Sequence, residues 1–118
     1  MLVQGLVAGK EVTARLEEIE LAGQRATALA LVFSELLGNA LEHGGRHVSI
    51  ELTRHGGDVE LAISDDGDGM DGSADGTGLS IVRALVRDEL GGVLSLSYDR
   101  GLRAKVVFPV ESPQARSS

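Results

Sequence analysis

The chain has 118 residues, no cysteine and a formal net charge of −7, which allows one domain and excludes disulfides and thiolate metal sites. The acidity argues against a nucleic-acid partner, because such binding neutralises phosphates with a basic surface. No apolar run approaches the roughly 18 residues that span a bilayer and no signal peptide is evident, so we expect a cytoplasmic domain without direct membrane contact.

The first third of the chain predicts a strand followed by a long helix. Residues 1–10 are apolar, with glycine interruptions and no clear period. Residues 12–21 alternate between polar and apolar side chains with one slip, which indicates a strand. Residues 24–43 have the longest helical pattern, and Gly44-Gly45 ends it. The predicted apolar face of this helix consists of Ala26, Leu29, Phe33, Leu37, Ala40 and Leu41.

The rest of the chain predicts two hairpins separated by a loop and a second helix. Four alternating segments form the hairpins, residues 48–53 with 59–64 and residues 93–98 with 103–110. Residues 65–78 are rich in glycine and aspartate, which indicates a loop. Residues 79–90 repeat apolar side chains at helical spacing, and Gly91-Gly92 ends that helix.

This order of elements predicts an α+β fold. We expect a two-layer α/β sandwich with a mixed, mainly antiparallel sheet and helices on one face, because strands that alternate polar and apolar residues need one covered face. A doubly wound parallel sheet is excluded, and the lysine-containing phosphate loop is absent. The predicted boundaries are 12–111 for the domain and 112–118 for a disordered tail.

The first chemical motif is a polar line on the long helix. Each helical residue turns about 100°, so Glu35, Asn39, Glu42 and His43 share one narrow arc. We place the apolar face on the opposite side, so that the polar line borders the core and can face a pocket. A carboxamide oxygen and a carboxylate suit magnesium, although for the line taken alone a solvated helix face is the favoured explanation. Gly38 costs roughly 1 kcal/mol in a helix and is explained by close approach of a ligand or strand.

The second motif is the acidic turn that follows the third predicted strand. Asp65 follows an apolar strand at the edge of the core. A buried carboxylate there can accept a hydrogen bond from the exocyclic amine of adenine, and Gly67 and Gly69 let the backbone approach the base. Two alternatives are an ordinary acidic turn and a calcium loop. The candidate calcium ligands at the appropriate spacing are Ser64, Asp66, Asp68, Gly69 and Asp75. The calcium alternative is weak, because the final ligand is aspartate rather than glutamate.

The third motif, Gly76-Thr77-Gly78, opens the second predicted helix. Unpaired amides and the helix dipole bind phosphate at such a position, although a plain helix entry is the favoured explanation of a single glycine motif. The order and spacing of the three motifs is more specific than any one of them.

Together the motifs resemble the boxes of the GHKL (Bergerat-fold) ATPase superfamily. Residues 35–43 resemble its N box, 65–69 its G1 box and 76–79 its G2 box, and the strand ending at Phe108-Pro109 resembles its last strand. The pattern Glu-Leu-x-x-Asn-Ala-x-x-His is similar to that of sensor histidine kinases with a short lid. The resemblance covers about residues 12–110.

The resemblance implies a function. The chain would be the ATP-binding catalytic domain of a two-component sensor histidine kinase. It would use Mg-ATP to phosphorylate a histidine on a separate dimerisation domain, for relay to a response regulator. Residues 1–11 would lead in from that dimerisation and phosphoacceptor domain, which this chain does not contain. The alternatives are an anti-sigma-factor-type serine kinase and a nucleotide-binding module without turnover.

The resemblance also implies roles for individual residues. Asn39 would bind magnesium (Mg2+), and Glu35 would orient a magnesium-bound water or act as catalytic base. The implied residues that contact the cofactor ATP are Asn39, His43, Asp65, Gly67, Gly69, Met70, Gly76, Thr77, Gly78 and Leu79. Two departures from the family pattern are Glu42, where a basic residue is common, and Leu102, where threonine is common. None of the three histidines lies in a phosphoacceptor pattern.

Overall fold

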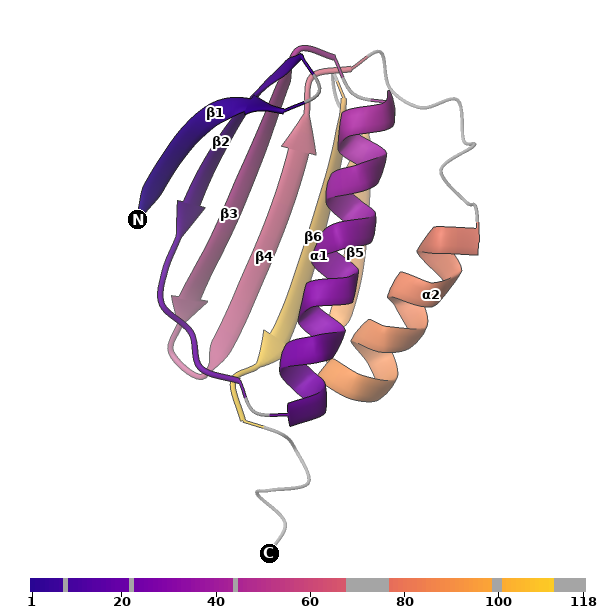
Figure 1. Ribbon diagram of the computed structural model, residues 1–118. Helices are drawn as coiled ribbons and strands as arrows, with labels where there is room; N and C mark the ends of the chain where they lie inside the picture. Colours follow the sequence, from indigo (N-terminus) through magenta and orange to yellow (C-terminus); the bar gives the residue numbers. More distant parts are fainter. Residues whose placement is uncertain (8, 22, 44, 68–76, 99–100, 112–118) are drawn as a thin grey trace, which may run out of the picture.

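The structure is a computed structural model that describes residues 1–7, 9–21, 23–43, 45–67, 77–98 and 101–111. Six strands form one sheet in the order β1-β2-β3-β4-β6-β5, and the helices cover one of its faces (Figure 1). The elements are β1 (Leu2–Val7), β2 (Lys10–Leu16), α1 (Gly23–His43), β3 (His47–His55), β4 (Asp58–Asp65), α2 (Thr77–Leu85), η1 (Val86–Leu90), β5 (Val93–Tyr98) and β6 (Leu102–Pro109). The predicted two-layer α+β fold with a mixed sheet is confirmed.

One strand pair makes the sheet mixed. β2 and β3 are parallel, whereas every other neighbouring pair is antiparallel. Parallel neighbours need a long crossover connection, and α1 supplies it, since its 21 residues join the end of β2 to the start of β3. The crossover places the C-terminal end of α1 beside the start of β3, where the candidate site lies.

The buried face of α1 differs from the predicted one. Ala28, Val32, Leu36 and Ala40 are each at most 3% exposed, and they recur every fourth residue, as one side of a helix does. Of the predicted face, Ala40 is buried, whereas Leu29, Phe33, Leu37 and Leu41 are only partly buried and Ala26 is exposed. The buried face is rotated relative to the predicted one because the sheet and α2 together cover the side of α1 that is centred near Leu36. The polar line borders the buried stripe, as predicted, but the stripe does not lie on the opposite side of the helix.

The first two strands also differ from the prediction. β1 was not predicted, and it pairs with β2 through a turn at Gly9, whose φ is 79°. All six residues of β1 are exposed. Because neither face of the strand is buried, its sequence needs no alternation of polar and apolar residues, which is the pattern that would indicate a strand. β2 begins at Lys10 and ends at Leu16, before the end of the predicted segment 12–21. The slip in alternation marks the point where the chain leaves the sheet for α1.

The second helix continues into one π-helical turn. α2 covers nine residues, and η1 extends it to Leu90. Gly91 adopts a φ of 68° and the amide of Gly92 donates a 2.9 Å hydrogen bond to the Val86 carbonyl. The glycines thus end the helix through a left-handed turn, as predicted.

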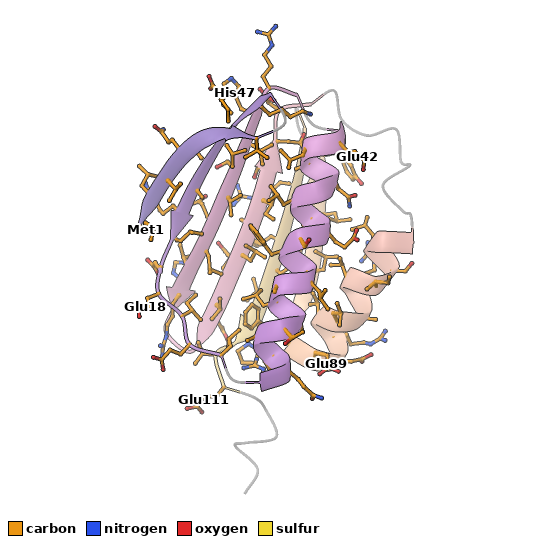
Figure 2. All side chains as sticks on the ribbon, viewed as in Figure 1. Met1, Glu18, Glu42, His47, Glu89 and Glu111 are labelled. Carbon is orange, nitrogen blue, oxygen red and sulfur yellow. The ribbon has the colours of Figure 1, made fainter. Side chains whose placement is uncertain are left out.

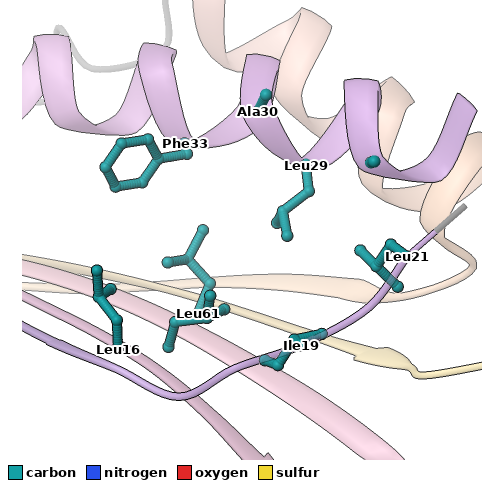
Figure 3. A pocket seen from close by; sticks show the side chains of 9 residues that line it. Leu16, Ile19, Leu21, Leu29, Ala30, Phe33 and Leu61 are labelled. Atoms are coloured by element: carbon teal, nitrogen blue, oxygen red, sulfur yellow. The ribbon is translucent and has the colours of Figure 1, made fainter. Parts of the chain in front are cut away.

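An apolar cavity of about 360 Å³ lies between the first half of α1 and the sheet. In Figure 3, Leu29 and Phe33 of α1 point toward Leu61 of β4, and Ile19 closes one side. The lining is Leu16, Ile19, Leu21, Ala26, Leu29, Ala30, Phe33, Leu52 and Leu61. Because specific recognition of a nucleotide requires polar groups in the lining, this cavity does not fit the predicted ligand.

Candidate functional site

Three elements meet at one end of the sandwich. The C-terminal end of α1, the end of β4 and the start of β6 lie at this end, whereas α2 begins about level with the middle of α1 (Figure 1). Glu42 near the end of α1 and His47 at the start of β3 mark the same end in Figure 2. The topology therefore brings the end of the helix that carries the first motif close to the strand end that carries Asp65, although the two are separated in sequence.

Asp65 ends the row of side chains that face the helices. Val59, Leu61 and Ile63 precede it on the same face of β4 and are at most 2% exposed. Asp65 pairs with Val48, which also belongs to the core. Its carboxylate is therefore half-buried at the rim of the core, which is where the sequence analysis expected it.

Two backbone amides hold the Asp65 carboxylate. The amide of Gly67 donates to Asp65 Oδ1 at 2.9 Å, and the amide of Leu102 donates to the same oxygen at 3.4 Å. Within the described part of the chain, neither hydrogen bond uses Oδ2. The arrangement fixes the carboxylate and leaves one oxygen for an external donor such as an exocyclic amine.

Gly101 packs directly against the backbone of this aspartate. Its φ is +132°, and a Cβ added there would lie 2.0 Å from the Asp65 carbonyl oxygen. Only glycine fits both the conformation and the space. In the sequence, Gly101 lies between the two segments of the second predicted hairpin, and no local pattern could have identified its contact with a segment 36 positions earlier.

The predicted metal-binding residues lie on one side of α1. Asn39 is half-buried beside Leu36 and Ala40, and Glu35 is exposed one turn earlier. A carboxamide at the rim and a carboxylate in solvent are compatible with a cation that keeps several waters. Among the described residues, no group of three or more histidine or acidic side chains gathers in the geometry of a metal site.

The third predicted motif leads into α2. α2 begins at Thr77, as the glycine-rich motif predicted. Leu79 is 2% exposed and packs in the core, so its side chain anchors the helix. Gly69, Met70, Gly76, residues 71–75 of the predicted loop and the predicted tail lie outside the described residues, and the side chains of His43, Thr77 and Gly78 are likewise not described.

Gly38 has no neighbour that requires a glycine. A Cβ added there would meet nothing within 4 Å, so the expected close approach of a strand does not occur in the described structure. We predict that Gly38→Ala raises the free energy of unfolding by up to about 1 kcal/mol, because alanine favours the helix. Chemical denaturation measures this change. A destabilised variant would contradict the open space seen at this position.

Comparison with known proteins decides the family. Residues 24–112 match the family of histidine kinase-, DNA gyrase B- and HSP90-like ATPases. The chain belongs to this family. The match spans both helices and the strands from β3 to β6, which carry the site described above, and membership in this ATPase family implies binding of ATP.

Similar proteins include sensor histidine kinases. The sensor histidine kinase PdtaS of Mycobacterium tuberculosis strain H37Rv is 36% identical over 97 residues, which cover 73% of this chain and 19% of that protein. PdtaS of Mycolicibacterium smegmatis is 37% identical over 83 residues, covering 61% of this chain and 17% of that protein. The chain thus spans about one fifth of the length of these relatives.

Solved structures of histidine kinases share the fold. The blue-light activated histidine kinase EL346 of Erythrobacter litoralis has a TM-score of 0.80 and 26% identity over 94% of this chain and 38% of that chain. The catalytic domain of histidine kinase ThkA has a TM-score of 0.67 at 20% identity, over 81% of this chain and 76% of that chain. No described helix of this chain has the length and apolar character to cross a bilayer.

Proposed function

We propose that this domain binds Mg-ATP and transfers its γ-phosphoryl group to a histidine on a separate dimerisation domain, for relay to a response regulator. The observation that carries the proposal is the Asp65 carboxylate, which two amides hold by one oxygen at the end of a buried row. The named activity of the PdtaS relatives supports the choice of phosphoryl acceptor.

Each residue has a distinct role in this proposal. Asp65 accepts a hydrogen bond from the adenine amine through Oδ2. Asn39 and Glu35 fit a magnesium ion that retains several waters, since one offers an amide oxygen and the other a carboxylate; magnesium would neutralise phosphate charge. Glu35 orients a water or accepts the proton of the attacking nucleophile. The amides at the start of α2 bind phosphate oxygens at the positive end of the helix dipole.

Phosphoryl transfer needs little covalent chemistry from the protein, because catalysis consists mostly of positioning and charge stabilisation. The two ends of the site lie on different elements, with Asp65 on β4 and Asn39 on α1. The close packing of sheet and helix therefore sets the distance between the part of the site for adenine and the part for the phosphates of ATP.

Calorimetric titration tests the nucleotide part of the proposal. We expect ATP to bind more tightly with magnesium than without it, and GTP to bind weakly because it lacks the amine that Asp65 recognises. Asn39→Ala is expected to remove the magnesium dependence and Asp65→Asn to weaken adenine recognition, each by about 1–3 kcal/mol. Gln24→Ala, which removes an exposed carboxamide from the first turn of the same helix, is the control. Absence of binding at millimolar ATP would refute the proposal.

Labelled ATP tests the transfer step. We expect the isolated chain to remain unlabelled and a dimerisation domain added in trans to acquire acid-labile phosphate. Transfer to a serine of an added partner would favour the serine-kinase alternative, and binding without transfer to either acceptor would favour a nucleotide-binding module.

A further inference from the structure

Asp66 forms a contact between two turns of the site. Its carboxylate oxygen Oδ1 accepts the backbone N–H of His47 at 3.0 Å. In the sheet, Asp65 pairs with Val48, so the next residues in each direction are Asp66 and His47. The carboxylate of Asp66 thus continues the ladder by one hydrogen bond after the paired backbone ends.

Gly45, in the connection after α1, lies directly against this carboxylate. A Cβ added at Gly45 would lie 2.4 Å from Asp66 Oδ1 and 2.9 Å from the Asp66 carbonyl oxygen. No side chain fits there without moving the Asp66 backbone or its carboxylate. Gly45 follows the helix that carries Asn39, so this contact joins the magnesium end of the site to the adenine end.

Further groups keep the Asp66 carboxylate ionised and the turn in place. The N–H of His47, and to a smaller extent the charge of its imidazole, hold the pKa of Asp66 below its ordinary value. The imidazole Nδ1 of His47 lies 2.9 Å from Glu11 Oε2 of β2, and the Glu11 amide donates to the Arg46 carbonyl at 2.8 Å. Both contacts anchor Arg46 and His47, the segment that donates to Asp66, to β2 of the sheet.

We propose that Asp66 is a positioning residue for adenine recognition: by tying the turn after β4 to the turn after α1, it fixes the orientation of the neighbouring Asp65 carboxylate. Gly101 packs against the Asp65 carbonyl and the His47 amide holds the Asp66 side chain, so this dipeptide is restrained from two directions. Asp66 itself contacts no base. The inference rests on the proposed function, because it needs Asp65 to recognise an amine.

The test compares ATP with purine riboside triphosphate, which lacks the 6-amino group. We expect the unchanged protein to bind ATP roughly tenfold more tightly than purine riboside triphosphate, as suits a hydrogen bond to a charged acceptor. The measured quantity is this ratio of the two affinities. Asp66→Ala should reduce this ratio to below about threefold, whereas Asp66→Asn should retain it because the amide oxygen still accepts the His47 N–H. Asp58→Ala, at the opposite end of β4, should retain it as well.

The ratio separates positioning from general stability. A variant that is merely less stable weakens both ligands equally and leaves the ratio unchanged, and this result for Asp66→Ala would overturn the inference. If the unchanged protein shows no preference for ATP, the role of Asp65 fails instead.

The donor of this hydrogen bond, the backbone N–H of His47, can be removed without changing Asp66. His47→Pro lacks the N–H and should lower the ratio in the same way, whereas His47→Ala keeps the N–H and should not. If both histidine variants behave alike, the hydrogen bond does not position Asp65. This pair also decides the question should Asp66→Ala fail to fold.

Discussion

Gly101→Ala is expected to weaken ATP binding by more than about 30-fold and to lower the free energy of unfolding by about 2 kcal/mol or more. Alanine is strained at a φ of +132°. Its Cβ would also overlap the Asp65 carbonyl oxygen, and the β4 backbone must move to relieve the overlap. That movement carries the Asp65 carboxylate, which we propose binds adenine, away from the Leu102 amide. Calorimetry and chemical denaturation measure the two effects.

Gly56→Ala is the matched control for this substitution. Gly56 also has a positive φ, +62°, but a Cβ added there meets nothing within 4 Å. It lies in the turn between β3 and β4, away from the site. The variant should lose a modest amount of stability from backbone strain and bind ATP normally. If both glycine variants bind ATP equally well, the contact of Gly101 with Asp65 does not shape the site.

Local periodicity explains why much of the fold could be predicted. The alternation in residues 48–53 and 59–64 and the glycine turn between them specify a hairpin, and the structure has it as β3 and β4. The helix at 24–43 has a long apolar pattern and a glycine stop, and α1 matches it within one residue. β1 escaped prediction because pairing with β2 buries none of its side chains.

The positions of motif residues could also be predicted, but not the contacts that orient them. Asp65 was expected at the edge of the core because it follows an apolar strand, and the alternation of that strand explains why its side chain lies on the core-facing side. Its hydrogen bond from Leu102 comes from a backbone amide, which every residue except proline possesses. The departure from threonine at this position therefore leaves that contact intact, and no side-chain pattern could reveal it.

Arg25→Leu is expected to lower the free energy of unfolding by about 2–4 kcal/mol, since hydrogen bonds from a charged donor contribute more than neutral ones. The Arg25 guanidinium, on the first turns of α1, donates to three carbonyls. Nη1 reaches Val110 at 2.7 Å, and Nη2 reaches Leu90 at 3.0 Å and Pro109 at 2.5 Å. The group thus joins three elements that are distant in sequence.

The geometry of this contact is specific to arginine. Its planar guanidinium presents several donors in a fixed arrangement, whereas a lysine ammonium is a single point charge. The guanidinium carbon also lies 5.7 Å from the centre of the Phe108 ring, close enough for a cation–π contribution. We therefore expect Arg25→Lys to recover only part of the stability that Arg25→Leu loses.

Arg54→Leu provides the comparison for general effects of removing an arginine. Arg54 is exposed and its Nε donates to the Gly56 carbonyl at 3.0 Å, so its loss should cost less than about 1 kcal/mol. Arg25 is also about 20 Å along the helix from Asn39, at about 1.5 Å per residue. ATP affinity of Arg25→Leu, measured well below its melting temperature, should consequently remain near that of the unchanged protein. Equal destabilisation by Arg25→Leu and Arg54→Leu would show that the three carbonyl contacts do not hold α1, η1 and β6 together.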